Sequence, residues 1–195
     1  MTMFDKLRAY CERSTHMTDE EYAFMQNLFL HKNFKKGEFF LREGEVAKYG
    51  AFVVKGCLRS YTVDNKGKEH IVQFAPEEWW IGNNESARTG TPSSYFIDAI
   101  EETDVLMLDR NSFQKIIETI PAFAAQFQVG IQKHASVKDQ RIIESLSASA
   151  EERYVKFLDK YPSIAQRVPQ HMLASYLGIS PETLSRVRKQ MSKKK

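Results

Sequence analysis

Short β-prone runs separated by glycines constrain the fold of this chain more than any other feature. They lie at residues 39–41, 51–54, 57–63, 71–74, 95–100 and 105–108. Turn residues divide the runs, and residues 64–68 have the composition of a tight hairpin turn. Regular spacing of short strands favours a closed or rolled antiparallel barrel over a flat open sheet.

Helical patterns precede and follow these runs. Residues 4–13 have helical spacing, and a capping box that begins at Thr18 predicts a second helix as far as Phe29. After the runs, helical spacing returns at residues 109–120 and again from Pro121 to Leu146. The sequence therefore predicts an α+β protein with an antiparallel β-roll, of the double-stranded β-helix kind, flanked by helices.

The long predicted helix carries an apolar stripe that a small roll would not cover. Its members are Phe123, Phe127, Ile131, His134, Val137, Ile142 and Leu146. Two copies of the chain could cover the stripe by pairing, which predicts a homodimer through the helix from Pro121 to Leu146. Lys138 and Arg141 interrupt the stripe, so a helix that lies along its own roll is the alternative.

Residues 168–189 have the pattern of a helix-turn-helix. Leu173, Ala174 and Leu177 lie on one face of a first helix, and Gly178 can end that helix in the left-handed conformation. Ser180 is suited to the N-cap of a second helix, and Pro181 to its first position. We expect three domains, at residues 1–120, 121–147 and 148–195, with an all-α C-terminal domain. Any wing beside this motif would have to come from residues 163–168.

The outward positions of this motif carry hydrogen-bonding and cationic groups suited to base edges and phosphates. Leu184 and Val187 face inward, which leaves an outer set made up of Glu182, Thr183, Ser185, Arg186, Arg188 and Lys189. His171 in the first helix either contacts phosphate or faces solvent. Residues 151–195 hold ten Lys or Arg against four Asp or Glu, so this part of the chain is basic. The sequence predicts binding to double-stranded DNA, with a solvated helical hairpin as the alternative.

Composition excludes several other classes. Cys11 and Cys57 are far apart, so neither a disulfide framework nor a cysteine-rich metal site is expected. No run of eighteen apolar residues exists, and no apolar segment follows a basic start. We therefore expect a cytoplasmic protein that is not attached to a membrane.

Several motifs resemble the Crp/Fnr family of bacterial transcription regulators over nearly the whole chain. Residues 36–38 and 42–45 are similar to the first turns of that family's cyclic-nucleotide-binding roll, and residues 52–59 to its next strand pair. Glu182, Ser185 and Arg186 match the Glu-x-x-Ser-Arg pattern of its Fnr-like recognition helix. The resemblance implies a regulator that is not an enzyme.

At the DNA end, the resemblance implies roles for individual residues. Glu182 would accept from a cytosine amino group and Arg186 would donate to guanine, with Ser185 making a nearby base or phosphate contact. Phosphate contacts are expected from Thr183, Arg188 and Lys189. The site would be an inverted repeat with a TGA-like core, read by a homodimer, and RNA polymerase is a further candidate partner.

The effector end departs from the family pattern. Cyclic-AMP-binding members have a Gly-Glu turn followed by Arg-Ser or Arg-Thr, whereas Asn83 follows Gly82 here and Ser93 holds the arginine position. Without that arginine the cyclic phosphate lacks its main partner, so we expect an unidentified effector instead of a cyclic nucleotide. Arg88 could substitute if its loop folds back. The candidate effector pocket consists of Gly82, Asn83, Asn84, Glu85, Ser93 and Ser94. For Trp79 and Trp80 beside it, we expect one to pack in the roll and the other to lie at the surface or in a linker, and the alternative is that they flank a different ligand.

Other chemistry has little support in the sequence. Cys11 stands alone near the N-terminus, so no iron-sulfur cluster is expected, and the histidines have no metal-ligand spacing. An alternative is a small-molecule-binding or cupin-like enzyme domain with an incidental helical tail, for which Glu69 and His70 are the candidate ligands. A third alternative retains DNA binding and treats the roll as a dimer scaffold without an effector.

Overall fold

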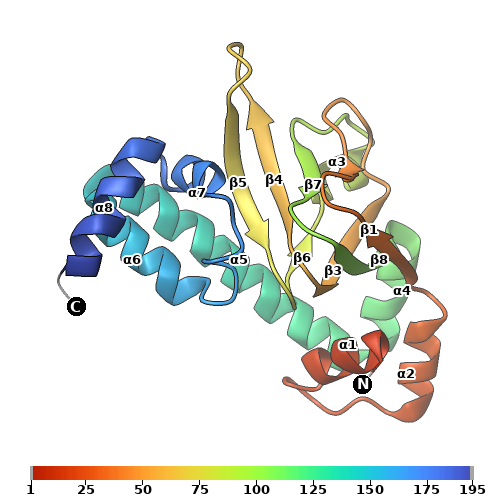
Figure 1. The fold of residues 1–195 in the computed structure, drawn as a ribbon. Helices are drawn as coiled ribbons and strands as arrows, with labels where there is room; N and C mark the ends of the chain where they lie inside the picture. The colour runs from red at the N-terminus through yellow and green to blue at the C-terminus, as the bar shows by residue number, and fades with distance from the viewer. Residues whose placement is uncertain (1, 194–195) are drawn as a thin grey trace. The chain divides into compact units, whose positions relative to one another are not determined.

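The computed structural model describes residues 2–193, apart from the side chains of His134 and Lys193. Lys194, Lys195 and the predicted stripe position at the His134 side chain therefore lie outside the described residues. Figure 1 shows the elements, which occur in the order α1 (Met3–Cys11), α2 (Asp19–Gln26), β1 (Leu30–Phe34), β2 (Phe39–Leu41), β3 (Tyr49–Lys55), β4 (Leu58–Val63), β5 (Glu69–Ala75), β6 (Trp80–Ile81), α3 (Asn84–Thr89), β7 (Phe96–Ala99), β8 (Thr103–Asp109), α4 (Arg110–Thr119), α5 (Pro121–Ser147), α6 (Ala150–Lys160), α7 (Gln170–Leu177) and α8 (Pro181–Lys193).

The strands form two four-stranded sheets, as the β-roll prediction required. One sheet has the order β1-β8-β3-β6 and the other has the order β2-β7-β4-β5, with antiparallel pairing along β8 and β3. Every predicted run forms a strand, and β1 and β6 are additional. The predicted α+β fold with an antiparallel roll is confirmed. One boundary was wrong: α2 ends at Gln26 because the chain turns there into β1, so residues 27–29 are not helical.

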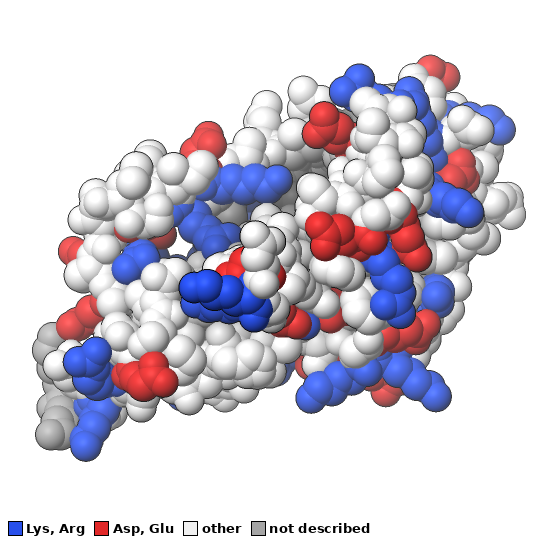
Figure 2. Space-filling model, turned by 90° about the horizontal axis from the view of Figure 1, so that it is seen from above, with Lys and Arg blue, Asp and Glu red and all other residues white. Residues whose placement is uncertain are grey.

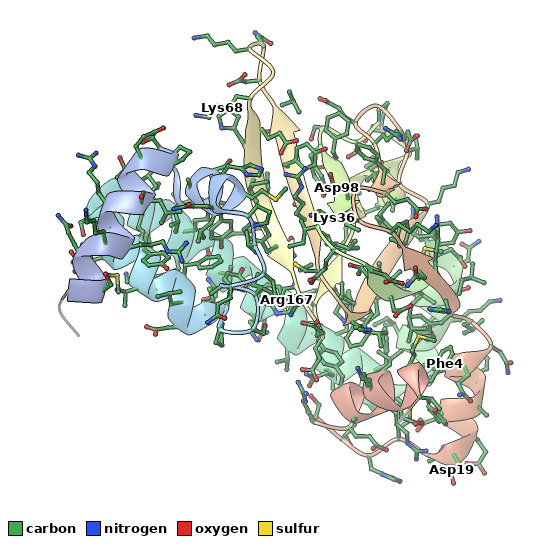
Figure 3. The ribbon with its side chains drawn as sticks, in the orientation of Figure 1. Phe4, Asp19, Lys36, Lys68, Asp98 and Arg167 are labelled. Carbon is green, nitrogen blue, oxygen red and sulfur yellow. The ribbon has the colours of Figure 1, made fainter. Side chains whose placement is uncertain are left out.

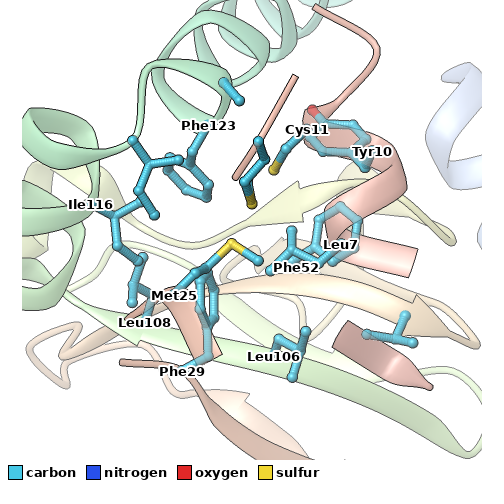
Figure 4. Packing of buried hydrophobic residues seen from close by; sticks show 14 residues of the cluster. Leu7, Tyr10, Cys11, Met25, Phe29, Phe52, Leu106, Leu108, Ile116 and Phe123 are labelled. Atoms are coloured by element: carbon cyan, nitrogen blue, oxygen red, sulfur yellow. The ribbon is translucent and has the colours of Figure 1, made fainter. Parts of the chain in front are cut away.

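Helices pack against one sheet to form the main apolar core. Leu7 of α1, Ile116 of α4 and Phe123 of α5 are buried against Phe52 of β3 and Leu106 of β8 (Figure 4). The helices are long enough to bury an apolar stripe and leave their polar faces outside. This core fixes the start of α5 on the roll.

Side-chain caps begin several helices, and the capping box at Thr18 was predicted from the sequence. Thr18 and Glu21 form a reciprocal capping box at the start of α2, and Asp109 accepts from the first amides of α4. Ser149 and Glu152 form the same box at the start of α6. Each cap contributes about 1 kcal/mol by satisfying amides that have no partner within the helix.

Helix α5 is continuous over 27 residues, from Pro121 to Ser147. Its first turns are buried, but Ile142 and Leu146 near its end are 60% and 83% exposed. The second half of α5 thus presents apolar side chains to solvent in the single chain.

No described helix is both long enough and apolar enough to cross a membrane.

The chain divides into two compact units. Unit 1 comprises residues 1–60 and 74–133, and unit 2 comprises residues 61–73 and 134–195. Unit 1 holds most of the roll with α1–α4 and the first half of α5. Unit 2 holds the end of the β4–β5 hairpin, the second half of α5, and α6–α8. The domain limits expected from the sequence stay a prediction.

Candidate nucleic-acid interface and effector region

Helices α7 and α8 form the predicted helix-turn-helix. Leu173 and Ala174 of α7 and Leu184 of α8 are almost completely buried. Gly178 ends α7 in the left-handed conformation, with φ 66°, and the hydroxyl of Ser180 accepts from the third amide of α8 at 3.2 Å. A residue with a Cβ would be strained at Gly178, so the turn depends on glycine.

One face of α8 is exposed and carries polar groups. Glu182, Ser185, Arg186 and Lys189 are all exposed and follow each other at the spacing of neighbours on a single helix face. Val187, on the opposite side, is buried with Leu184. Burial of the apolar face therefore fixes which side chains α8 presents.

Internal contacts prearrange part of this face. Arg186 Nη2 donates to the hydroxyl of Thr183 at 3.2 Å, and Thr183 itself is half-buried. A hydrogen bond from the Ser180 hydroxyl holds the pKa of Glu182 below its usual value, and the charge of Arg186 acts in the same direction. Glu182 is therefore an ionised acceptor at neutral pH, next to a guanidinium donor.

The remaining DNA candidates lie at the edges of this face. Arg188 is exposed on the flank of α8, and His171 is exposed at the start of α7. Residues 162–167 form successive turns, so this segment does not supply wing strands.

Figure 2 shows one face of the molecule, where Lys and Arg are interspersed with Asp and Glu.

Unit 2 also contains contacts that the sequence did not predict. The hydroxyl of Ser175 on α7 accepts from the amide of Ile71 at 3.0 Å and donates to the carbonyl of Glu69 at 2.8 Å. Arg141 of α5 donates to the carbonyls of Ile71 and Val72, and its guanidinium lies over the ring of Tyr176. The β4–β5 hairpin is thereby attached to the first helix of the motif.

The candidate effector residues form an internal hydrogen-bond network in unit 1. Asn83 caps α3, and its Nδ2 donates to the hydroxyl of Ser93 at 3.1 Å. That hydroxyl donates in turn to the carbonyl of Tyr95 at 2.8 Å, and the phenol of Tyr95 donates to the carbonyl of Gly82 at 3.0 Å. Ser93 is 2% exposed. Three of the six candidates, Gly82, Asn83 and Ser93, are therefore brought together and engaged with protein groups.

The other candidates face outward. Asn84 and Glu85, in the first turn of α3, and Ser94 are exposed. Arg88 is exposed as well, and its carbonyl accepts from Arg110 at 2.7 Å. Among the described residues, no arginine takes part in the Ser93 network. Burial raises the pKa of Tyr95 to about 12, so its phenol remains a donor.

A buried ion pair inside the roll was missed by sequence reasoning. Arg59 of β4 donates to both carboxylate oxygens of Asp98 on β7, at 2.7 and 3.0 Å (Asp98 is labelled in Figure 3). Both side chains are buried, so each neutralises the other where solvent cannot. The pair shows that the cationic charge of Arg59 is already compensated by a carboxylate.

Trp79 and Trp80 are packed in unit 1. Trp79 is buried with Lys133 over its ring, and Trp80 contacts the rings of Phe52, Phe123 and Phe127. This agrees with the packing role expected for at least one of them, and both contribute to the core.

The groups considered for metal chemistry are dispersed. Within residues 2–193, no three His, Cys, Asp or Glu side chains are grouped as metal ligands. His70 pairs with Asp64 at 2.8 Å across the hairpin turn. Cys11 is a buried free thiol, and burial raises its pKa to about 12.

A roll of this topology, followed by a long helix and a helix-turn-helix, is the architecture of proteins that combine a ligand-binding type of domain with a DNA-binding type of motif. The family model of the cyclic nucleotide-binding domain matches residues 31–120. Residues 31–120 therefore belong to the cyclic nucleotide-binding domain family, and the chain as a whole is similar to transcription regulators of the Crp/Fnr family, the resemblance that its motifs predicted.

Named relatives agree with this assignment. The transcriptional activator protein anr of Pseudomonas aeruginosa is 24% identical over 164 residues, which cover 78% of this chain and 66% of that protein. The nitrogen fixation regulation protein FixK of Bradyrhizobium diazoefficiens is 26% identical over 166 residues, covering 79% of this chain and 68% of that protein. The match therefore spans slightly less than two thirds of anr.

Solved structures share the fold. FixK2 from Bradyrhizobium japonicum superimposes with a TM-score of 0.71 and 22% identity, covering 85% of each chain. The c-di-GMP responsive regulator CLP of Xanthomonas campestris gives a TM-score of 0.71 at 13% identity, covering 91% of this chain and 93% of that one. At such identities the likeness concerns the fold.

Proposed function

We propose that this chain is a homodimeric, sequence-specific DNA-binding regulator and has no catalytic role. The exposed face of α8 carries the proposal. Its four neighbouring side chains include a carboxylate acceptor at Glu182 and guanidinium and ammonium donors at Arg186 and Lys189. These groups match the chemistry of base edges and phosphates in the major groove, and the buried Leu184 keeps them pointing outward.

Within this proposal each side chain has a separate task. Glu182 accepts from a cytosine amino group, Arg186 donates to a guanine, and Ser185 makes a contact beside them. Lys189, Arg188 and Thr183 contact phosphates, as does His171 from α7, and these contacts set the register of the motif on DNA. The predicted half-site has a TGA-like core.

Dimerisation through α5 would place two such half-sites in an inverted repeat. Ile131, Ile142, Ile143 and Leu146 are between 49% and 83% exposed in the single chain. Pairing of two α5 helices from Pro121 to Leu146 would bury these side chains, and burial of apolar area is favourable. A second copy of this chain is thus the proposed partner of that face, and the spacing of two α8 helices would set the spacing of half-sites.

Regulation would come through the roll by an effector other than a cyclic nucleotide. Support comes from the Asn83–Ser93–Tyr95 network, which uses the polar groups of the candidate phosphate site internally. Arg59 is neutralised by Asp98 and offers no spare charge to a phosphate. Titration with cyclic AMP and cyclic GMP should leave the unfolding temperature unchanged, and a clear rise at micromolar ligand would contradict this part of the proposal.

Selection of bound sequences from a random DNA pool tests the main proposal. The full chain should enrich an inverted repeat in which both halves contain the same core. Enrichment of no sequence, with binding that depends on DNA length alone, would contradict sequence-specific recognition. Enrichment of a single, unrepeated half-site would retain DNA reading and reject the dimer.

A further inference from the structure

A cavity of about 240 Å³ lies within unit 2, between α5, α6 and α7. It is separate from the exposed face of α8. Phe157, Tyr161 and Tyr176 line one part of it, and their ring centroids are 5.1–6.0 Å apart. Three mutually packed rings make a rigid wall against which a flat apolar group can pack.

The same cavity has an excess of positive charge. Arg141, Arg153, Lys156 and Lys160 line it, and Glu144 is the acidic residue of its lining. Lys156 Nζ already pairs with Glu144 at 3.3 Å. With four cationic side chains against one carboxylate, the wall has a net positive charge in a partly enclosed space, where a negative ligand group is favoured.

Two arginines of the wall have no carboxylate partner among the described residues. Arg153 Nη1 donates to the carbonyl of Leu177 at 2.7 Å, but its buried Nε–H has no hydrogen-bond partner within the described part of the chain. Arg141 donates to carbonyls and stacks on Tyr176, and burial lowers the pKa of Arg141. Both arginines are partly buried, and a guanidinium group shielded from water is stabilised by pairing with an anion, so both observations favour a ligand that supplies one.

We propose that this cavity binds a small aromatic monocarboxylate. Its carboxylate would accept hydrogen bonds from Arg153, near the positive charges of Arg141 and Lys160, and its ring would pack against Phe157 and Tyr176. Drug-sized ligands need pockets of about 300–1,000 Å³, so a cavity of this size calls for a ligand with a single ring.

Such a ligand would connect α5 to the helices that precede α8. It would contact side chains of α5, α6 and α7 at once, and would therefore favour the arrangement of these helices in which the cavity is formed. A change in DNA affinity on binding is a consequence that rests on the proposed function. Binding itself does not depend on it and can be measured without DNA.

Isothermal titration of the full chain with benzoate, without DNA, tests the proposal. We expect saturable binding at one site per chain, with a Kd of about 1 mM or tighter for a ligand of this size. Benzyl alcohol, which has the ring but no charge, and sulfate, which has charge but no ring, should each bind at least about tenfold more weakly. Equal binding of sulfate and benzoate would overturn the aromatic part of the proposal, and no saturable benzoate binding would overturn the site.

Variants locate the binding. Arg153→Gln should weaken benzoate binding about tenfold or more, and Lys156→Gln, which leaves the Leu177 contact intact, should weaken it to a smaller extent. Lys115→Gln on α4 removes the same charge from an exposed position in unit 1 and should leave benzoate binding unchanged. Circular dichroism would establish that each variant is folded. Equal weakening by Lys115→Gln, or unchanged binding in folded Arg153→Gln and Lys156→Gln, would overturn the assignment.

Discussion

The guanidinium carbon of Arg141 lies 4.1 Å from the centre of the Tyr176 ring. This contact joins the long helix α5 to α7, the first helix of the helix-turn-helix. The same guanidinium donates to two carbonyls of β5, and Ser175, next to Tyr176, bonds to β5 as well. Three segments far apart in the chain are therefore held together by polar contacts to the strand backbone.

Replacing Ser175 with alanine should loosen the hairpin. Ser175→Ala removes an acceptor for the Ile71 amide and a donor to the Glu69 carbonyl, at a cost of about 0.5–1.5 kcal/mol for each bond. Amide exchange at Ile71 should become faster. Ser192→Ala removes an exposed hydroxyl from α8 and serves as the control. Unchanged exchange at Ile71 would mean that Ser175 does not hold the hairpin.

Replacing Arg186 with alanine should remove discrimination at one base pair. Loss of a bidentate donor to guanine costs about 1–3 kcal/mol with the preferred DNA and much less with DNA changed at that pair. Fluorescence anisotropy with both duplexes measures the difference. Arg167→Ala, which removes an exposed arginine outside α8, should retain the discrimination. If Arg186→Ala retains it too, Arg186 is not a base reader.

Replacing Lys189 with glutamine should weaken binding to all sequences alike. A phosphate contact carries no sequence information, but it releases a counterion from DNA. The slope of log affinity against log salt should become shallower by about 1. A change in sequence preference without a change in slope would assign Lys189 to base contacts.

Charges placed on the exposed face of α5 should separate the dimer. Ile142→Glu combined with Leu146→Glu would bury four like charges in the proposed seam, which is strongly unfavourable. Light scattering should then give the mass of a single chain. Gln166→Glu adds one charge at an exposed position outside α5 and should leave the dimer intact. A variant that stays dimeric would place the interface elsewhere.

The β4–β5 hairpin should lose stability in acid. A hydrogen bond from His70, with further bonds from the amides of Lys68 and Lys66, holds the pKa of Asp64 at about 2, below its usual 3.8. Because the folded pKa is depressed, the stabilisation is present above about pH 4 and is lost as the pH falls through 2. NMR titration of the Lys68 amide measures this. In Asp64→Asn the dependence over that pH range should disappear, and its persistence would implicate another carboxylate.

Much of the fold could be predicted because local signals and tertiary packing agree. Caps at Thr18 and Ser180, the left-handed position at Gly178 and the β-prone runs divided by turn residues are all signals within a few residues. The helix-turn-helix was predicted almost residue by residue, since burial of Leu173 and Leu184 follows from spacing alone. The strand β1 was not predicted, because four of its five residues are exposed and pairing with β8 defines it.

Features that depend on distant residues could not be predicted. Arg59 and Asp98 are 39 positions apart, and nothing in their local sequence identifies them as a pair. The short helix α3 lies where the sequence suggested a ligand loop, because Asn83 acts as a cap. The cavity of unit 2 draws its arginines from α5 and α6, so it exists only once those helices pack.

Gly178 has no side chain, yet it belongs to two surfaces. It makes the turn that aims α8, and it lines the cavity, with Arg153 Nη1 3.5 Å from where a Cβ would lie. Any larger residue would disturb the direction of α8 and the shape of the cavity together. A substitution at Gly178 therefore cannot change the direction of α8 without also changing the shape of the cavity. A variant that alters only DNA binding, or only ligand binding, requires substitution of a residue that contacts DNA alone or the ligand alone.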